Sequence, residues 1–134
     1  MKRICSLLLA CVLCAFCAGC SQPDALTLDL SQGYGRHTKL IHLNASSAEK
    51  EARLQAFYQV LEEADPLEKD PSLFAYYPDY LLELTDHGTT TTAVVDINGD
   101  FIDFYYPSED GQEPQQLYRS HVTAAEFRKL VHQN

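Results

Sequence analysis

The chain has few residues that could cross-link it or attract a polyanion. All five cysteines lie within the first 20 of its 134 residues, so the remainder has neither a disulfide nor a thiolate metal site. Ten Lys and Arg stand against 19 Asp and Glu, for a net charge of −9. Because nucleic acids and anionic lipid surfaces are recognised by clustered Lys and Arg, this balance argues against both as partners. Tryptophan is absent too, although the chain has eight Tyr and six Phe.

The sequence also lacks the usual catalytic and metal-binding motifs. It contains no H-E-x-x-H and no G-x-S-x-G, and no two of its five histidines stand four residues apart. Ser120 and His121 are chain neighbours, which does not make them a catalytic pair. We therefore expect no catalytic residues, no metal and no other cofactor. The alternative is a hydrolase whose active-site residues are not adjacent in the sequence.

One acidic series has calcium-like spacing. Asp96, Asn98 and Asp100 match the first three ligands of an EF-hand loop. Such a loop also needs Gly at its sixth position and Glu at its twelfth, where this chain has Phe101 and Pro107. A β-hairpin explains these residues better.

A single long apolar run lies at the N-terminus. Lys2 and Arg3 precede apolar residues 4–16, a run too short to span a membrane, and small residues lead to the polar Ser21. Its cysteines at 11, 14, 17 and 20 follow C-x2-C-x2-C-x2-C, whereas ferredoxin-type clusters use C-x2-C-x2-C-x3-C-P. The basic start, the short apolar run and the small residues before a polar segment are together typical of a secretory signal.

The end of the run, Cys17-Ala18-Gly19-Cys20, resembles the lipobox of bacterial lipoproteins, with Cys17 in place of the usual Leu. The resemblance implies that cleavage precedes Cys20, that Cys20 carries a diacylglyceryl group, and that the protein is anchored at the extracytoplasmic face of the cell membrane. It divides the chain into a signal peptide (1–19), a lipidated tether (20–25) and one α+β domain (26–134). An ordinary secretory signal cut nearby, which leaves Cys20 free, is the alternative. Without Lys2 and Arg3, eight basic residues face 19 acidic ones, a net charge of −11.

Two segments have helical patterns with start signals. Residues 46–49, Ser-Ser-Ala-Glu, form a predicted capping box before an apolar stripe that ends near Asp65-Pro66. That stripe consists of Leu54, Phe57, Tyr58 and Leu61. Residues 123–126, Thr-Ala-Ala-Glu, form a second box, and Val122 with Phe127 have the spacing of a hydrophobic staple. We expect one long helix and one short terminal helix.

Six segments read as strands: 25–30, 39–43, 80–85, 91–97, 101–106 and 117–122. Asn98-Gly99 predicts a two-residue hairpin loop that places Val95 opposite Ile102 and Ala93 opposite Phe104. Residues 65–78, with three prolines, read as a loop. With the first and last strands optional, we expect an antiparallel sheet of about four to five strands in a two-layer α+β sandwich. The order is (β)β-α-β-β-β-(β)-α, a layout similar to that of small lipoproteins of Gram-positive bacteria.

The aromatic residues give one functional hint. Tyr76 and Tyr77 lie between Pro71 and Pro78, and neighbours in an extended segment point to opposite sides, so at most one of them can be in the core. Tyrosine is enriched at interfaces, although core filling is the competing explanation. We therefore expect a membrane-tethered, non-catalytic binding module whose ligand is an envelope protein or a small molecule, with Tyr76 and Tyr77 as its candidate contact surface.

Overall fold

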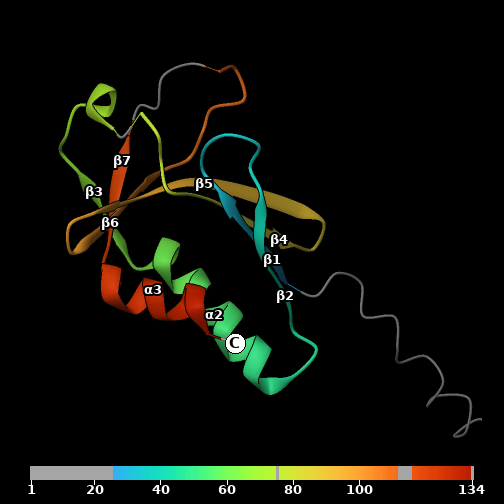
Figure 1. Ribbon diagram of the computed structural model, residues 1–134. Coiled ribbons are helices and arrows are strands. Elements are labelled where there is room, and N and C mark those ends of the chain that lie inside the picture. The colour runs from blue at the N-terminus through green and yellow to red at the C-terminus, as the bar shows by residue number, and fades with distance from the viewer. Residues whose placement is uncertain (1–25, 75, 112–115, 134) are drawn as a thin grey trace, which may run out of the picture.

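Seven strands form one antiparallel sheet in the computed structural model, which describes residues 26–74, 76–111 and 116–133 (Figure 1). The strands are β1 (Thr27–Gln32), β2 (Lys39–Asn44), β3 (Ala64–Leu67), β4 (Tyr80–Asp86), β5 (Thr89–Asn98), β6 (Phe101–Tyr105) and β7 (Leu117–Ser120). Their order across the sheet is β2-β1-β4-β5-β6-β7-β3. The α+β class is confirmed, but the sheet is larger than the expected four to five strands.

Two α-helices pack on one face of this sheet, as Figure 1 shows. They are α2 (Ala48–Glu62) and α3 (Ala124–His132). A short 3₁₀ helix, η1 (Pro71–Leu73), lies in the connection between β3 and β4. The Arg53 guanidinium joins the two α-helices by donating to the Leu130 carbonyl oxygen, with Nη2 at 2.6 Å and Nε at 2.9 Å.

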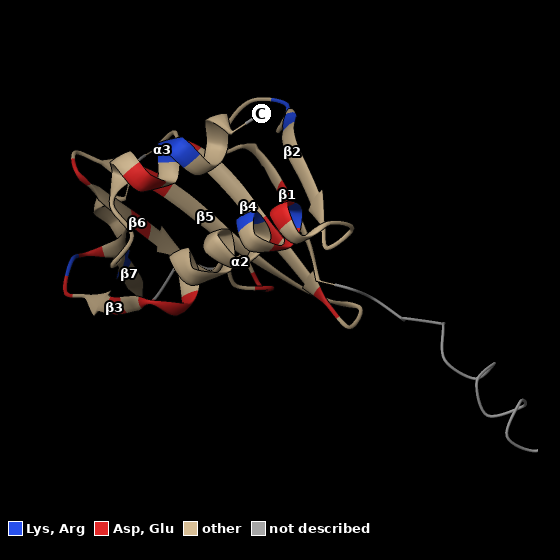
Figure 2. Ribbon diagram, turned by 90° about the horizontal axis from the view of Figure 1, so that it is seen from below, with Lys and Arg blue, Asp and Glu red and all other residues tan. Residues whose placement is uncertain are grey.

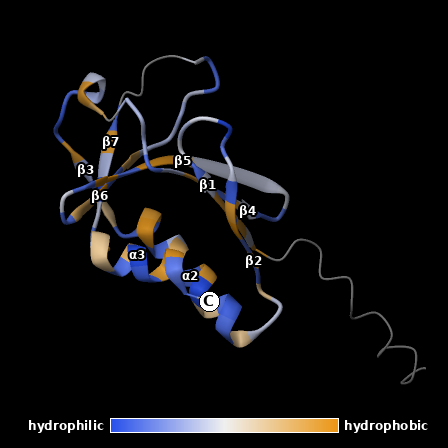
Figure 3. Ribbon diagram, in the orientation of Figure 1, coloured by the Kyte–Doolittle hydropathy of each residue, from blue (hydrophilic) through white to orange (hydrophobic). Residues whose placement is uncertain are grey.

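The core fills the space between the sheet and the helices, where the apolar segments of both layers face each other (Figure 3). Each strand contributes alternate residues because side chains along a strand point to opposite faces. The Phe57 and Phe127 rings meet edge to face, 5.8 Å between centroids, and so join the two helices within the core. The largest fully buried side chains are Phe57, Phe104, Phe127, Leu28, Leu30, Leu54, Leu82, Ile102, Leu117, Val60 and Val95.

The strand that the sequence analysis missed is β3. Residues 65–78 were expected to be a loop, yet Ala64–Leu67 pairs antiparallel with β7 and places Asp65 opposite Arg119. Asp65-Pro66 indicated the end of the helix, and the three prolines of residues 65–78 favoured a loop. Proline is tolerated at an edge, however, and β3 is the outermost strand of the sheet.

The start of α2 also differs from the prediction. The N-cap is Ser47, whose Oγ accepts from Lys50 N at 3.3 Å, so the residue three positions on is Lys50 and not Glu49. No reciprocal carboxylate bond forms there, and the predicted capping box at residues 46–49 is wrong. The second box is confirmed: Thr123 Oγ1 accepts from Glu126 N, and Glu126 Oε2 accepts from Thr123 N.

The hairpin between β5 and β6 forms as predicted, but in another register. Asn98 pairs with Phe101, so the two loop residues are Gly99 and Asp100, and Val95 faces Phe104 in place of Ile102. Gly99 has a positive φ of 63°. Asn98 was expected to share that conformation, as a type I′ turn needs, but here glycine takes the first central position, as in type II′. The shift is two residues, so every side chain keeps its predicted face.

Candidate binding surface

Three tyrosines gather where the β1–β2 turn meets the segment that leads into β4. Tyr76 and Tyr77 are 88% and 70% exposed, and Tyr34 is 49% exposed. The Tyr76 and Tyr77 rings lie 4.9 Å apart edge to face, and Tyr77 meets Tyr34 at 6.4 Å in the same manner. Edge-to-face pairing is a favourable arrangement of aromatic rings, so the three side chains support one another in solvent. We call Tyr34, Tyr76 and Tyr77 the tyrosine cluster.

Gly33 brings the two segments of the tyrosine cluster together. Its N–H donates to the Asp79 carbonyl oxygen at 2.9 Å. A Cβ at this position would lie 2.4 Å from the Pro78 carbonyl oxygen and 2.7 Å from Tyr80 N, closer than real Cβ atoms come. Only glycine permits this approach of two backbones, and the approach places Tyr34 beside Tyr77.

The loop that carries Tyr76 and Tyr77 is anchored before and after them. Asp70 caps η1, its Oδ1 accepting from Ser72 N at 3.0 Å, and Phe74 packs edge to face on Tyr105 at 4.9 Å. After the tyrosines, Asp79 Oδ2 accepts from Ile97 N at 2.7 Å. These contacts hold both ends of the loop on the sheet face opposite the α-helices, so the exposed rings stand on a fixed base.

The carboxyl groups of Asp79 and Asp96 form a pair where the loop joins the sheet. Burial raises the pKa of Asp96 to about 6, helped by a hydrogen bond with Asp79 and by the negative charges of Asp79 and Asp103. Two carboxyl groups can share a hydrogen bond only while one of them holds a proton. The hydrogen bond between Asp96 on β5 and Asp79 is therefore strongest below about pH 6.

Beside this pair lies a buried ion pair. Asp103 is 2% exposed, and its two oxygens accept from Arg119 Nε at 2.7 Å and Nη2 at 2.9 Å. Asn98 Nδ2 adds a third donor at 3.1 Å. Burial alone would raise the pKa of Asp103, but the bonds from Arg119 and Asn98 outweigh it and lower that pKa. The guanidinium also lies over the Phe101 ring, 4.0 Å from its centroid.

Of the three site residues predicted from the sequence, the structure describes Tyr76 and Tyr77. Both Tyr76 and Tyr77 are exposed, which fits the expectation that at most one would be buried. Cys20 lies outside the described residues, as do the predicted signal peptide at 1–19 and the rest of the predicted tether at 20–25. Tyr34 was missed, although a tyrosine between two turn glycines, Gly33 and Gly35, is placed for exposure at a loop tip.

One His–Asp pair resembles part of a catalytic arrangement. His121 Nε2 lies 2.8 Å from Asp65 Oδ2, but both side chains are more than half exposed. The neighbouring Ser120 hydroxyl accepts from Val122 N at 3.1 Å and is thereby engaged on its own strand end. The pair is a surface contact between β3 and the residue that follows β7. Within the described residues no group of three or more His, Cys, Asp or Glu side chains could hold a metal ion.

The distribution of charge and hydropathy adds little to the location of a functional site. Figure 2 shows basic segments on α2, on α3 and near β2, separated by other residues. No helix in the described part of the chain is long and apolar enough to cross a membrane.

In the comparisons with known proteins, neither a family model, a curated protein nor a solved structure matched the chain.

Proposed function

We propose that the chain is a membrane-tethered extracytoplasmic lipoprotein whose domain acts as a non-catalytic binding module. The tyrosine cluster is its contact surface, and an envelope protein or a small ligand is its partner. The observation that carries this proposal is the exposure of Tyr76 and Tyr77, two large aromatic rings that stand in solvent on an anchored loop. A fold that used these rings only for stability would bury them.

Preorganisation supports the same function. Binding costs free energy when mobile side chains become ordered, and tyrosine has few rotatable bonds to order. In the tyrosine cluster the rings already touch each other, and Gly33 and Asp79 fix the backbone beneath them. An aromatic anchor held in this way contributes on the order of 1–2 kcal/mol or more when it is buried against a partner.

The tether supports the location of the binding module. Two acyl chains on Cys20 would give stable anchoring, whereas a single chain binds membranes only marginally. The mature chain, at a net charge of −11, would not adhere to an anionic membrane surface. The domain would therefore stand off the bilayer with its tyrosine cluster accessible.

Photo-cross-linking tests this function in living cells of the source organism. A benzoylphenylalanine residue replaces Tyr76 in the full chain, and a second variant carries it at His87, an exposed residue that directly follows the far end of β4. We expect an adduct of defined mass with an envelope component from position 76 and none from position 87. Equal labelling from both positions, or none from position 76, would contradict the assignment of the surface.

A further inference from the structure

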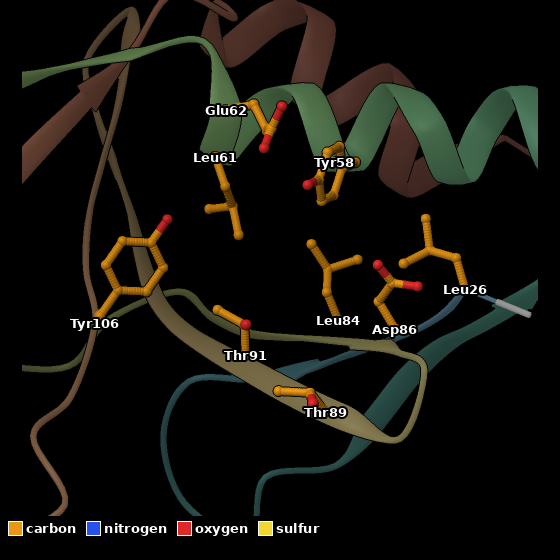
Figure 4. Close-up of a pocket in the computed structure, with 9 residues that line it drawn as sticks. All are labelled: Leu26, Tyr58, Leu61, Glu62, Leu84, Asp86, Thr89, Thr91 and Tyr106. Atoms are coloured by element: carbon orange, nitrogen blue, oxygen red, sulfur yellow. The ribbon is translucent and has the colours of Figure 1, made fainter. Parts of the chain in front are cut away.

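A cavity lies at the opposite end of β4 from the tyrosine cluster. Tyr77 comes just before β4, whereas Asp86 is the last residue of this seven-residue strand, ~20 Å further on. There a cavity of about 460 Å³ opens between the C-terminal half of α2 and the β4–β5 hairpin (Figure 4). This is within the range of small-molecule sites.

The floor of this cavity is apolar and consists of core residues. Leu61 comes from α2 and Leu84 from β4, and their side chains point toward each other across the space in Figure 4. Both are members of the buried core, and they are 8% and 4% exposed. A hydrocarbon group of a few carbons could rest on this floor and leave water at a gain of about 0.8 kcal/mol per buried CH₂.

The rim of the cavity is negative. Glu62 on α2 and Asp86 on β4 contribute two carboxylates, and no Lys, Arg or His lies in the described lining. Glu62 accepts the hydroxyl hydrogen bond of Tyr58, which raises the pKa of that tyrosine. Asp86 has a loose exposed contact with His87 Nε2 at 3.5 Å. Both carboxylates keep lone pairs for a further donor.

Two tyrosines complete the polar rim. The hydroxyl groups of Tyr58 and Tyr106 both point into the space between α2 and the hairpin (Figure 4). Burial raises the pKa of Tyr106, so its hydroxyl stays neutral and can accept a hydrogen bond at any physiological pH. Tyrosine rings also attract cations to their faces, an attraction that adds to that of the carboxylates.

From this lining we infer that the cavity between α2 and the β4–β5 hairpin binds a small alkylammonium cation, with its hydrocarbon body on Leu61 and Leu84 and its ammonium group among Glu62, Asp86 and the two tyrosine hydroxyls. The ligand follows from complementarity: an apolar floor selects a hydrocarbon body, and two carboxylates with no Lys, Arg or His in the described lining select a positive head over a neutral or negative one. This site goes beyond the proposed function and does not depend on the tyrosine cluster.

The test uses the full lipidated chain in a neutral detergent, labelled with 3-fluorotyrosine. Fluorine NMR then follows eight tyrosines, and Tyr58→Phe and Tyr106→Phe identify the two resonances at the cavity. Three probes share one hydrocarbon body: pentylammonium, pentanol and pentanoate. We expect pentylammonium to shift those two resonances in a saturable way, pentanol to bind at least several-fold more weakly, and pentanoate not to bind.

Single neutral substitutions locate the site. Glu62→Gln and Asp86→Asn should each weaken pentylammonium binding about three- to fivefold. Glu63→Gln is the matched control, because Glu63 is an exposed carboxylate next in the chain that lines a different groove. Its affinity should stay within twofold of the wild type. A non-saturable shift, equal binding of pentanol, or equal weakening by Glu63→Gln would each overturn the proposal.

Discussion

Removing Arg119 should destabilise the fold more than neutralising its partner Asp103, although the two form one ion pair. Asp103 is 2% exposed, while the Arg119 side chain is 31% exposed. Arg119→Met keeps an apolar side chain of similar length but removes the guanidinium that lies over Phe101, and it leaves a buried carboxylate with Asn98 as its remaining hydrogen-bond donor. Breaking a buried pair in this way costs about 3–5 kcal/mol. Because the Arg119 side chain is partly exposed, we expect about 3 kcal/mol, the lower end of that range.

The reciprocal change is milder for a structural reason. Asp103→Asn preserves the side-chain volume and still offers one oxygen to Arg119, whose guanidinium can turn part of its surface to water. A hydrogen bond that involves a charged group contributes about 1.5–3 kcal/mol, and only part of it is lost. We expect Asp103→Asn to cost about 1–2 kcal/mol.

Urea denaturation of the full chain at pH 7 and pH 4.5 measures both costs. In the wild type the pKa of Asp103 is lowered, so its stabilisation is present above its unfolded pKa of 3.8 and is lost as the pH falls through the folded value. In Arg119→Met burial acts with less opposition and raises that pKa, so the carboxyl can take up a proton at pH 4.5. The destabilisation by Arg119→Met should therefore shrink on acidification. Equal costs for the two variants, or a cost independent of pH, would refute this reasoning.

Three further predictions follow from single features. Because the folded pKa of Asp96 is raised to about 6, its stabilising effect is complete below 3.8 and is lost as the pH rises through 6. The wild type should therefore gain on the order of 1 kcal/mol in urea melts between pH 7.5 and pH 5, and Asp96→Asn should abolish that gain. Gly33→Ala should cost about 1–3 kcal/mol in the same assay, because its Cβ would push Pro78 away; an unchanged midpoint would exclude the tight backbone approach. Mass spectrometry of the membrane-extracted protein should find a diacylglyceryl group on an N-terminal Cys20, and Cys20→Ala should release the domain or leave the precursor uncleaved; a soluble product that begins elsewhere would contradict the lipobox interpretation.

Much of the fold could be predicted because its signals are local. The apolar stripe of α2, the capping box of α3 and the β5–β6 hairpin each depend on residues a few positions apart, and all three elements formed, the hairpin in another register. What failed depended on tertiary context. The three prolines of residues 65–78 indicated a loop, but proline is tolerated at a sheet edge, and β3 exists only because β7 lies beside it. The hairpin register shifted because glycine at the first loop position was as acceptable as at the second.

The candidate surface was predictable only in part. Adjacent tyrosines between two prolines indicated that at least one ring would be exposed, from chain geometry alone. The third member, Tyr34, is more than 40 residues away, and only the packing of Gly33 against Pro78 brings it to Tyr77. The cavity at the other end of β4 had no sequence signal, because its lining combines positions from α2, β4 and β5 with Tyr106, which follows β6.

The most direct test of the binding function separates stability from recognition at the tyrosine cluster. Tyr76→Ala and Tyr77→Ala, made singly in the full chain, are compared with Tyr76→Phe and Tyr77→Phe, which keep the rings. For each variant the melting temperature is measured together with capture of the partner that position 76 cross-links. At least one alanine variant should melt within about 2 °C of the wild type, since its ring is exposed, yet lose most of the captured partner. The phenylalanine variants should retain it. If both alanine variants lose stability and neither selectively loses the partner, the tyrosines serve the fold and the surface is wrongly assigned.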